Sequence, residues 1–286
     1  MAKHTLKKFV RGESTPGRLR IQPRDAALIR DFASFRFLNT AQILALRAGS
    51  KGHFQHRLTS LYQLGYVDRP EGQKAFNLPS DHIIYSLGKK GAELAFPDER
   101  DRKLWARLNA KISSPNLEHA LMVSQFRIVL TLALQTHGGK ITRWLQGYEL
   151  KDKLTLRGRL SPAIVPDGFF TIDVGDGLYH FFLEADRSKM NHRRFLEKLR
   201  AYWDWWRDKT YNEWLDITKF RVLTITDTEG RKENLRVTSK EADTRREGSN
   251  MFLFACEKDY SLKNPKAVLE AIWASPKGGS KHSLLE

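Results

Sequence analysis

Cysteine is almost absent from this chain of 286 residues, which contains only Cys256. A single thiol cannot close an internal disulfide or build a thiolate metal cluster, so nothing requires an oxidising compartment. A long apolar run is also lacking, because residues 120–134 contain Gln125 and Arg127 and are shorter than the roughly 20 residues of a bilayer span. Residues 1–12 lack the apolar core of a signal peptide. We therefore expect a cytoplasmic protein without a membrane partner.

Several catalytic motifs are missing as well. The sequence has no glycine-rich phosphate-binding loop, no zinc ligand set and no nucleophile elbow, so ATP-driven work and hydrolase triads have no support. Acidic residues are in deficit, since 49 Lys and Arg against 33 Asp and Glu give a net charge of +16. Such a surplus attracts polyanions, and nucleic acid is the commonest soluble one. The charge favours a nucleic-acid partner; a basic protein kept soluble by its charge is the alternative.

Three short helices and two strands are predicted for the first hundred residues. The helices are expected from about Pro23, over residues 40–48, and across Phe54, Leu58 and Leu61; the strands are expected near residues 66–69 and 83–87. This order is the layout of a winged helix-turn-helix domain, whose third helix enters the major groove of DNA. We assign this domain to residues 23–97, after a basic disordered arm over residues 1–22.

The third predicted helix supplies the candidate DNA contacts. If its apolar residues face the core, its polar side chains point outward. Gln55 and His56, near the helix start, are expected to read bases, with Thr59 on the same face. Contacts to phosphates are expected from Lys51, Arg57, Arg69 and Lys74. The alternative is a solvated polar face that is used for protein contact.

The second half of the chain predicts an α/β or α+β domain with a mixed sheet and helices on both faces. The expected elements are a helix over 116–137, strands near 141–149, 165–173 and 178–186, a helix over 191–209, a strand over 219–226, a polar helix near 229–246 and a strand over 250–255. This domain is assigned to residues 116–274. The charged residues 98–115 are expected to be a linker, and residues 275–286 a disordered tail.

Carboxylates end up on adjacent strands of this predicted sheet. Asp167 opens one strand, while Glu184 and Asp186 close the next and share a face, because strand side chains alternate. Two buried like charges are costly unless a cation joins them. With Asp167 they would form an oxygen-rich site for Mg²⁺ or Mn²⁺, which supports phosphodiester cleavage by activating water. The alternative is that the strand ends leave the core, so that the acids are solvated or paired with the nearby Arg187, Arg193 and Arg194.

The order Pro166-Asp167 and then Glu184-Ala185-Asp186 resembles the PD-(D/E)XK nuclease core of restriction endonucleases. Together with the predicted winged helix and the run from Phe195 to Tyr202, residues 25–255 resemble the replication-relaxation family of plasmid and mobile-element proteins, which includes conjugative relaxases. The resemblance implies that Asp167 and Glu184 bind the metal. It also implies an auxiliary acid, for which the candidates are Glu149 and Glu118.

Residue 186 departs from the nuclease pattern, which has lysine where this chain has Asp186. That lysine polarises the attacked phosphate, and the candidates to replace it are Lys189 and Lys198. His119 is a candidate proton carrier. Among the aromatic residues of the helix over 191–209, Trp205 is expected to stack on single-stranded bases, and Tyr202 and Trp206 are expected in the core.

The sequence thus predicts a sequence-selective DNA-binding protein of a plasmid or mobile element that nicks or processes DNA at an origin. The alternative is a catalytically inactive, nuclease-like DNA binder that acts as a transcriptional regulator or accessory replication or mobilisation factor. Asp186 favours this alternative, so the sequence leaves open whether the protein is an enzyme. Expected partners are double-stranded DNA, single-stranded DNA near the acidic site, and a second copy or other mobile-element proteins.

Overall fold

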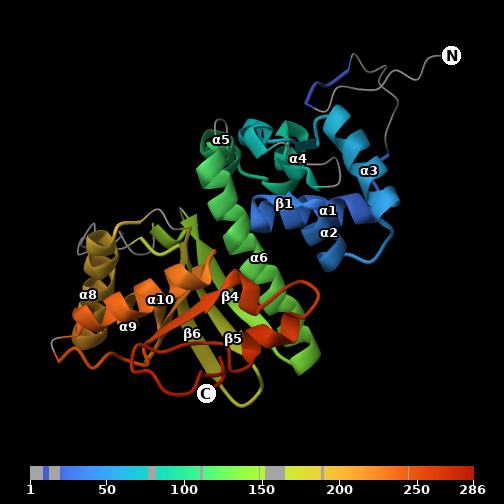
Figure 1. The fold of residues 1–286 in the computed structure, drawn as a ribbon. Helices are drawn as coiled ribbons and strands as arrows, with labels where there is room; N and C mark the ends of the chain where they lie inside the picture. The colour runs from blue at the N-terminus through green and yellow to red at the C-terminus, as the bar shows by residue number, and fades with distance from the viewer. Residues whose placement is uncertain are drawn as a thin grey trace. The chain divides into compact units, whose positions relative to one another are not determined.

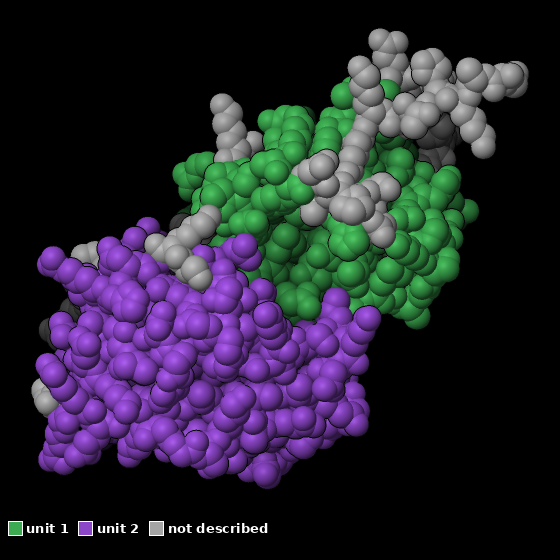
Figure 2. Space-filling model, viewed as in Figure 1, with its two compact units in different colours: residues 1–128 green, residues 129–286 purple. Residues whose placement is uncertain are grey.

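The computed structural model describes residues 9–12, 20–76, 82–109, 112–147, 149–151, 165–187, 190–243 and 245–286. Within these residues the protein is mixed α and β, with a small antiparallel sheet and a larger mixed sheet (Figure 1). The chain divides into two compact units, unit 1 (Met1–Ile128) and unit 2 (Val129–Glu286), coloured separately in Figure 2. The boundary between them falls inside the long helix α6 (Ser114–His137).

Unit 1 has its predicted helices and strands in the predicted order, together with the short strand β1 and the 3₁₀ helix η1, which the sequence did not predict. The elements are α1 (Pro23–Phe35), β1 (Leu38–Asn39), α2 (Thr40–Leu46), α3 (Lys51–Gln63), β2 (Val67–Asp68), η1 (Glu71–Phe76), β3 (Ile84–Leu87) and α4 (Lys89–Ala95). Strand β3 lies between β1 and β2 and is antiparallel to both. The two strands predicted after the third helix are therefore neighbours in one sheet.

Capping residues explain where these helices begin. The Asn39 side chain accepts a hydrogen bond from the Gln42 N–H, and the Gln42 side chain accepts one from the Asn39 N–H, which together form a capping box at α2. The Ser50 side chain accepts from the His53 N–H at the start of α3. After α3, Gly65 has a φ of 82°, a left-handed conformation that glycine adopts without steric cost.

Residues 98–115, expected to be a linker, are largely helical, and the division between the two units falls later, inside α6. Helix α5 (Glu99–Asn109) occupies most of this segment. The helix is attached to unit 1 through the Trp105 ring, which contacts the Phe96 ring at 5.4 Å, and through a hydrogen bond of 2.7 Å from Arg36 to the Asn109 side chain. The high charge of this segment reflects the exposed face of a helix.

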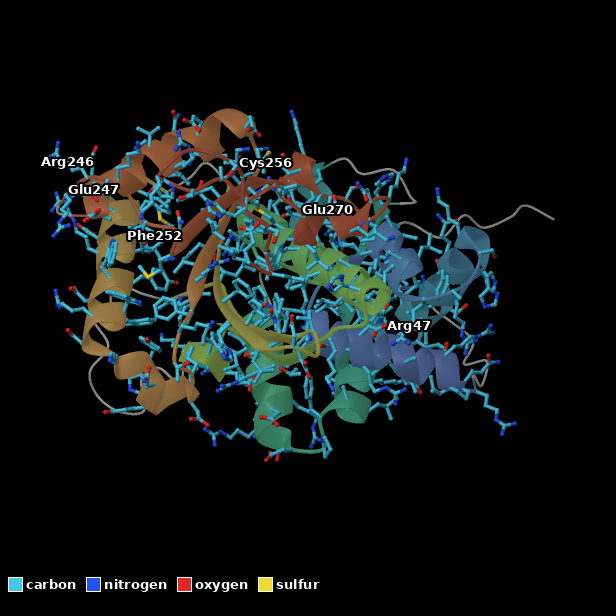
Figure 3. The ribbon with its side chains drawn as sticks, turned by 90° about the horizontal axis from the view of Figure 1, so that it is seen from below. Arg47, Arg246, Glu247, Phe252, Cys256 and Glu270 are labelled. Atoms are coloured by element: carbon cyan, nitrogen blue, oxygen red, sulfur yellow. The ribbon has the colours of Figure 1, made fainter. Side chains whose placement is uncertain are left out.

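Unit 2 contains a five-stranded mixed sheet in the order β4-β5-β6-β7-β8. The strands are β4 (Lys140–Gln146), β5 (Gly168–Asp173), β6 (Leu178–Asp186), β7 (Arg221–Thr226) and β8 (Phe252–Cys256), whose two end residues are labelled in Figure 3. Strand β5 is antiparallel to both β4 and β6, whereas β6, β7 and β8 are parallel to one another. The predicted mixed sheet is confirmed. The connections between the parallel strands carry α8 (His192–Asp208), α9 (Thr210–Leu215) and α10 (Glu229–Thr238).

Aromatic side chains of β6 and α8 form much of the core of unit 2. The centroid of the Phe182 ring lies 5.4 Å from that of the Tyr202 ring and 5.6 Å from that of the Trp205 ring. Tyr202 is buried as predicted, but the assignment of the two tryptophans is reversed, since Trp205 is 6% exposed and Trp206 is 48% exposed. The reason is that Trp214 of α9 packs against Trp205 and covers it. Trp206 is therefore the tryptophan available at the surface.

Residues 275–286, expected to be a disordered tail, pack against unit 2 instead. Ala274 forms an antiparallel bridge with Phe254 of β8, and Trp273 forms one with His282. The Leu284 side chain is fully buried, and its N–H donates to the Leu269 carbonyl at 3.2 Å. The segment is mostly small and polar, but the buried Leu284 and the bridge from the adjacent Ala274 to β8 hold it against the rest of unit 2.

Helix α6 is, among the described residues, the one helix that is long and apolar enough by length and composition to cross a membrane. Its apolar side chains are used inside the protein, where Phe126, Val129, Leu130 and Leu134 are fully buried. Such burial is the pattern of a core helix, which passes the same test of length and composition. Helix α6 therefore gives no support for a membrane partner.

Candidate functional site

Asp167 is fixed against the end of β6 by two hydrogen bonds. Its N–H donates to the Leu183 carbonyl at 3.0 Å, and its Oδ2 accepts from the Ala185 N–H at 2.8 Å. These bonds continue the antiparallel pairing in which Gly168 lies opposite Leu183. The start of β5 therefore places the Asp167 carboxylate next to Glu184, as expected for acids at the meeting ends of adjacent strands.

Glu184 is buried, with 3% of the residue exposed, on the sheet face that α8 covers. Its Oε2 forms an ion pair with the Lys198 ammonium, and its Oε1 accepts a hydrogen bond of 2.7 Å from the Tyr202 hydroxyl. Lys198 and Tyr202 are four residues apart on α8 and so lie on one face of that helix. Both carboxylate oxygens of Glu184 thus have donors from α8. We call Asp167, Glu184, Lys198 and Tyr202 the acidic cluster.

Two carboxylates and one ammonium set the electrostatics of the acidic cluster. Burial raises the pKa of Glu184, and the nearby Asp167 adds to this effect, while Lys198 opposes it. Burial alone would lower the pKa of Lys198, but the carboxylates of Glu184 and Asp167 outweigh it and raise that pKa. Burial and the Glu184 carboxylate also raise the pKa of Tyr202 well above its usual range. The raised pKa values therefore come mainly from burial for Glu184 and Tyr202, and from the neighbouring carboxylates for Lys198.

Asp186, which stands at the position of the expected lysine, is part of a second buried ion pair. The Arg231 guanidinium donates to both Asp186 oxygens, at 2.8 and 3.0 Å, and also to the Met190 carbonyl. Arg231 belongs to α10, so this pair joins the end of β6 to α10 and to the segment that leads into α8. The sequence suggested arginine partners for these acids, and Arg231 is not one of the three that it named. One of those three, Arg193, pairs with Glu197 on the surface of α8.

The remaining acid and base candidates are Lys189, Glu149, Glu118 and His119. Lys189 lies outside the described residues. Glu149 is exposed. Glu118 and His119 are half-buried on the unit 1 part of α6, and their roles stay predictions. Among the described residues, no group of three or more His, Cys, Asp or Glu side chains could hold a metal ion.

In unit 1, two of the expected DNA contacts on α3 are exposed and a third is partly so. Lys51 and His56 are exposed, and Gln55 is partly exposed, near the start of that helix. Lys74 is exposed in η1, where it pairs with Glu71 at 2.8 Å. These positions keep the geometry that the sequence predicted for an outward face.

Arg57, Thr59 and Arg69, expected to contact DNA, are instead used to hold unit 1 together. Arg57 pairs through two nitrogens with Asp25, a fully buried carboxylate at the start of α1. Arg69 is 8% exposed; it donates to the Thr59 hydroxyl at 3.2 Å and lies 4.3 Å over the Tyr62 ring. The sequence could not reveal these contacts, because their partners are distant in the chain.

A third arginine of unit 1 shows the same arrangement. Arg47, labelled in Figure 3, donates to the two oxygens of Asp31 at 2.7 and 2.6 Å. It ties the end of α2 to α1, as Arg57 ties α3 to the start of α1. The positive charge of unit 1 is therefore partly consumed by internal pairs, and the exposed lysines carry more of the outward charge than the formal count suggests.

Sequence reasoning missed the functional geometry of Tyr202 and Arg231. Tyr202 was assigned to the core, which is correct, but its hydroxyl also holds the Glu184 carboxylate. The spacing of Lys198 and Tyr202 on one helix face was the available signal. Arg231 carries no local signal, because it is 45 residues from its partner Asp186.

A comparison with protein families finds one match: a family model described as replication-relaxation covers residues 29–218, about two thirds of the chain. The match includes Asp167, Glu184 and Lys198 and ends before Arg231. Neither the search of curated proteins nor the search of solved structures gives a match.

Proposed function

The chain belongs to the replication-relaxation family, and from this premise we propose that it nicks DNA at an origin of a plasmid or other mobile element. Family membership indicates a role in the replication or processing of such elements. The proposal assigns sequence recognition to unit 1, as a winged-helix domain, and phosphodiester cleavage to unit 2, as a PD-(D/E)XK-like core.

The convergence of Asp167, Glu184 and Lys198 is the observation that carries this proposal. The three residues come from the start of β5, the end of β6 and the middle of α8. Two carboxylates and a lysine at neighbouring strand ends are the groups that metal-assisted phosphodiester cleavage needs. Lys198 takes the role of the lysine that is missing at position 186, because it is the ammonium adjacent to Glu184.

The donor set suits Mg²⁺ or Mn²⁺. Such ions are commonly bound by one or two carboxylates together with water and substrate phosphate, and the acidic cluster offers Asp167 and Glu184. Its excess of negative groups favours a cation. When bound, the ion would polarise the phosphate and lower the pKa of a water molecule. Tyr202 holds Glu184 in place, and Lys198, shared between Glu184 and the phosphate, would stabilise the charge that develops on the phosphate.

Recognition of duplex DNA is assigned to the exposed start of α3. Lys51 would contact phosphates, while Gln55 and His56 would reach base edges in the major groove. The net charge of +16 supports attraction to the polyanion. Arg57 and Arg69 are left out of this surface, because their charges serve internal contacts.

The decisive experiment is a nicking assay on supercoiled plasmid that carries the native flanking DNA, with and without Mg²⁺ or Mn²⁺. We expect metal-dependent conversion to the open-circular form by the wild type. Asp167→Asn and Glu184→Gln should abolish nicking while duplex affinity is retained. The matched control is Glu197→Gln, which removes an exposed carboxylate from α8 and should leave nicking unchanged.

Metal binding has its own test that does not depend on cleavage. An ion that binds the folded chain but not the unfolded chain raises the melting temperature by mass action. We expect Mn²⁺ to raise the melting temperature of the wild type and to have no such effect on Asp167→Asn. A wild type that melts at the same temperature with and without metal would remove the ion from the proposal.

A catalytically inactive DNA binder is the second candidate, and two observations favour it. Both Glu184 oxygens already have donors from α8, and Asp186 is locked by Arg231. In that case the protein would act as a transcriptional regulator or as an accessory replication or mobilisation factor. Sequence-selective duplex binding without nicking in either metal would establish this candidate and overturn the first.

A further inference from the structure

Unit 1 contains a pocket that the proposed DNA-recognition surface does not use. Its volume is about 900 Å³, and it lies between the end of α3, the strands β2 and β3, and the helices α4 and α5. Residues 9–11 of the N-terminal segment also line it. This volume is far larger than an inorganic anion needs and lies in the range of pockets that hold small organic ligands.

Positive charge predominates in the lining of this pocket. Among the described residues, six Lys or Arg and three Asp or Glu line it. Two of the carboxylates are matched within the pocket, by the Arg11–Asp68 pair at 3.2 Å and the Lys74–Glu71 pair at 2.8 Å. Lys103 is matched by Glu99, at 2.9 Å, from outside the lining. The surplus of cations that remains favours an anionic occupant. Lys89, the first residue of α4, is exposed at the pocket and adds a flexible ammonium.

Flat groups provide the second property of the pocket. The partly exposed Trp105 ring of α5 lines it. Tyr62 and Arg69 line it as well, but Tyr62 is only 4% exposed, and the Arg69 guanidinium covers its ring at 4.3 Å. The Arg69 side chain is further held by the hydroxyl groups of Thr59 and Tyr85. Aromatic rings and guanidinium planes are the surfaces on which nucleobases stack. The lining therefore favours a ligand that has a flat ring as well as negative charge.

We propose that this pocket binds a nucleotide, with the phosphate attracted by Lys89 and the neighbouring cations and the base placed against the Trp105 ring. The nucleotide can come from two sources: a free nucleoside phosphate, or an unpaired nucleotide of a DNA strand. The site is separate from the exposed start of α3 and goes beyond the recognition of duplex DNA proposed above.

Calorimetric titration of the full chain with deoxyadenosine 5′-monophosphate tests this site. We expect the nucleotide to bind at least tenfold more tightly than inorganic phosphate or deoxyadenosine, because only the nucleotide uses both the cations and the Trp105 ring. Lys89→Ala should weaken nucleotide binding about tenfold, the usual effect of losing one charged contact. The matched control is Lys90→Ala, the adjacent lysine of α4, which lies over the Tyr66 ring and does not line the pocket.

The two sources are separated by repeating the titration with a single-stranded tetranucleotide of deoxyadenosine. Tighter binding of the tetranucleotide than of the mononucleotide, lost in Lys89→Ala, assigns the site to a DNA strand; the reverse order assigns it to a free nucleotide. Absence of nucleotide binding at millimolar concentration, equal affinity for inorganic phosphate, or equal losses in the two lysine variants would overturn the proposal.

Duplex binding, measured in parallel, keeps this proposal separate from the proposed function. Lys51→Ala should weaken duplex binding and leave the mononucleotide affinity unchanged. Lys89→Ala should weaken mononucleotide binding and leave the duplex affinity unchanged. A wild type that does not bind duplex DNA would contradict the recognition surface on α3. The nucleotide site would then be judged by its own titration.

Discussion

The ion pair between Glu184 and Lys198 is buried, and this decides what happens when one partner is removed. A buried charge that loses its partner pays the full cost of desolvation, whereas replacing both partners with neutral groups removes that cost. We expect Lys198→Met to lower the free energy of unfolding by about 3–5 kcal/mol. The double variant Lys198→Met/Glu184→Gln should recover part of the loss, as measured by urea denaturation.

The control for this prediction is the exposed pair of Arg193 and Glu197 on the same helix. Because solvent screens such a pair, Arg193→Ala should change the unfolding free energy by less than about 1 kcal/mol. A loss in Lys198→Met as small as the loss in Arg193→Ala would mean that Glu184 and Lys198 are solvated rather than buried together.

Glu184 also makes the stability of the protein depend on pH. Because burial raises the pKa of this carboxyl above its usual 4.5, the folded chain binds the proton more readily than the unfolded chain. The stability contributed by protonation is complete below pH 4.5 and is lost as the pH rises through the raised pKa. As the pH rises through this range, the unfolding free energy of the wild type should therefore fall relative to that of Glu184→Gln. The exposed Glu197→Gln should show no comparable trend.

At this scale the sequence predicts faces but not partners. Strand alternation correctly placed Glu184 and Asp186 on one side of β6, because the side-chain period of a strand is two. It could not supply Arg231, which comes from a helix 45 residues later in the chain, nor the pairing of Arg57 with Asp25 across 32 residues. A charged side chain looks the same in the sequence whether it faces solvent or a buried carboxylate.

Among the elements, α8 carries the lysine of the acidic cluster, and Arg231 fixes the chain just before that helix. Its guanidinium joins Asp186 at the end of β6 to the Met190 carbonyl, two residues before α8. We expect Arg231→Met to expose the N-terminal turns of α8 to hydrogen exchange and to reduce nicking. Arg207→Ala, on the exposed surface of α8, is the control and should leave both unchanged. Unaltered exchange in Arg231→Met would show that the pair does not position α8.

In the proposed function, sequence recognition depends on the start of α3. Lys51→Ala should weaken binding to specific and random duplexes by similar factors, because phosphates carry no sequence information. Gln55→Ala and His56→Ala should lose mainly the preference for the specific site. Arg57→Ala should instead destabilise unit 1, since it leaves the buried Asp25 without its guanidinium. Affinity measurements on the two duplexes and a melting curve separate these effects, and equal losses on both duplexes in all three variants at the start of α3 would remove the recognition assignment.

Element positions were accessible from the sequence where periodicity is strong, and packing was not. The helix near residues 40–48 and the strand over 178–186 were found from capping and alternation, and they correspond to α2 and β6. The tryptophans of α8 were exchanged because burial at the end of that helix depends on α9, through Trp214. Periodicity says which side chains share a face and is silent about what covers that face.

For the whole molecule, net charge is the property that would govern the proposed association with DNA. Each phosphate that the protein neutralises releases condensed counterions, so the logarithm of the affinity should fall with the logarithm of salt concentration by about 0.9 per contact. We expect duplex affinity, measured by fluorescence anisotropy from 50 to 200 mM salt, to fall by at least tenfold. An affinity that stays constant over this range would mean that the +16 charge is not used for DNA binding.

Composition gives the net charge of the whole molecule directly, but it does not show which polar segments pack against the rest of the chain. It predicted a linker and a disordered tail from charge and small residues, yet α5 is attached by Trp105 and the final segment by Leu284. Single apolar anchors are enough to order such segments, because the rest of the side chains remain in solvent. A polar average therefore conceals the few side chains that decide whether a segment folds.

The bridge between Ala274 and Phe254 has a consequence for how the protein behaves at high concentration. Strand β8 is the last strand of its sheet, and a strand in that position offers unpaired amides and carbonyls to any other extended chain. Ala274 occupies one position of this hydrogen-bonding row, and the adjacent Trp273 is paired with His282. This segment therefore covers part of the edge of the sheet and limits its pairing with strands of other copies. We expect a chain shortened before Trp273 to expose this edge and to aggregate more readily.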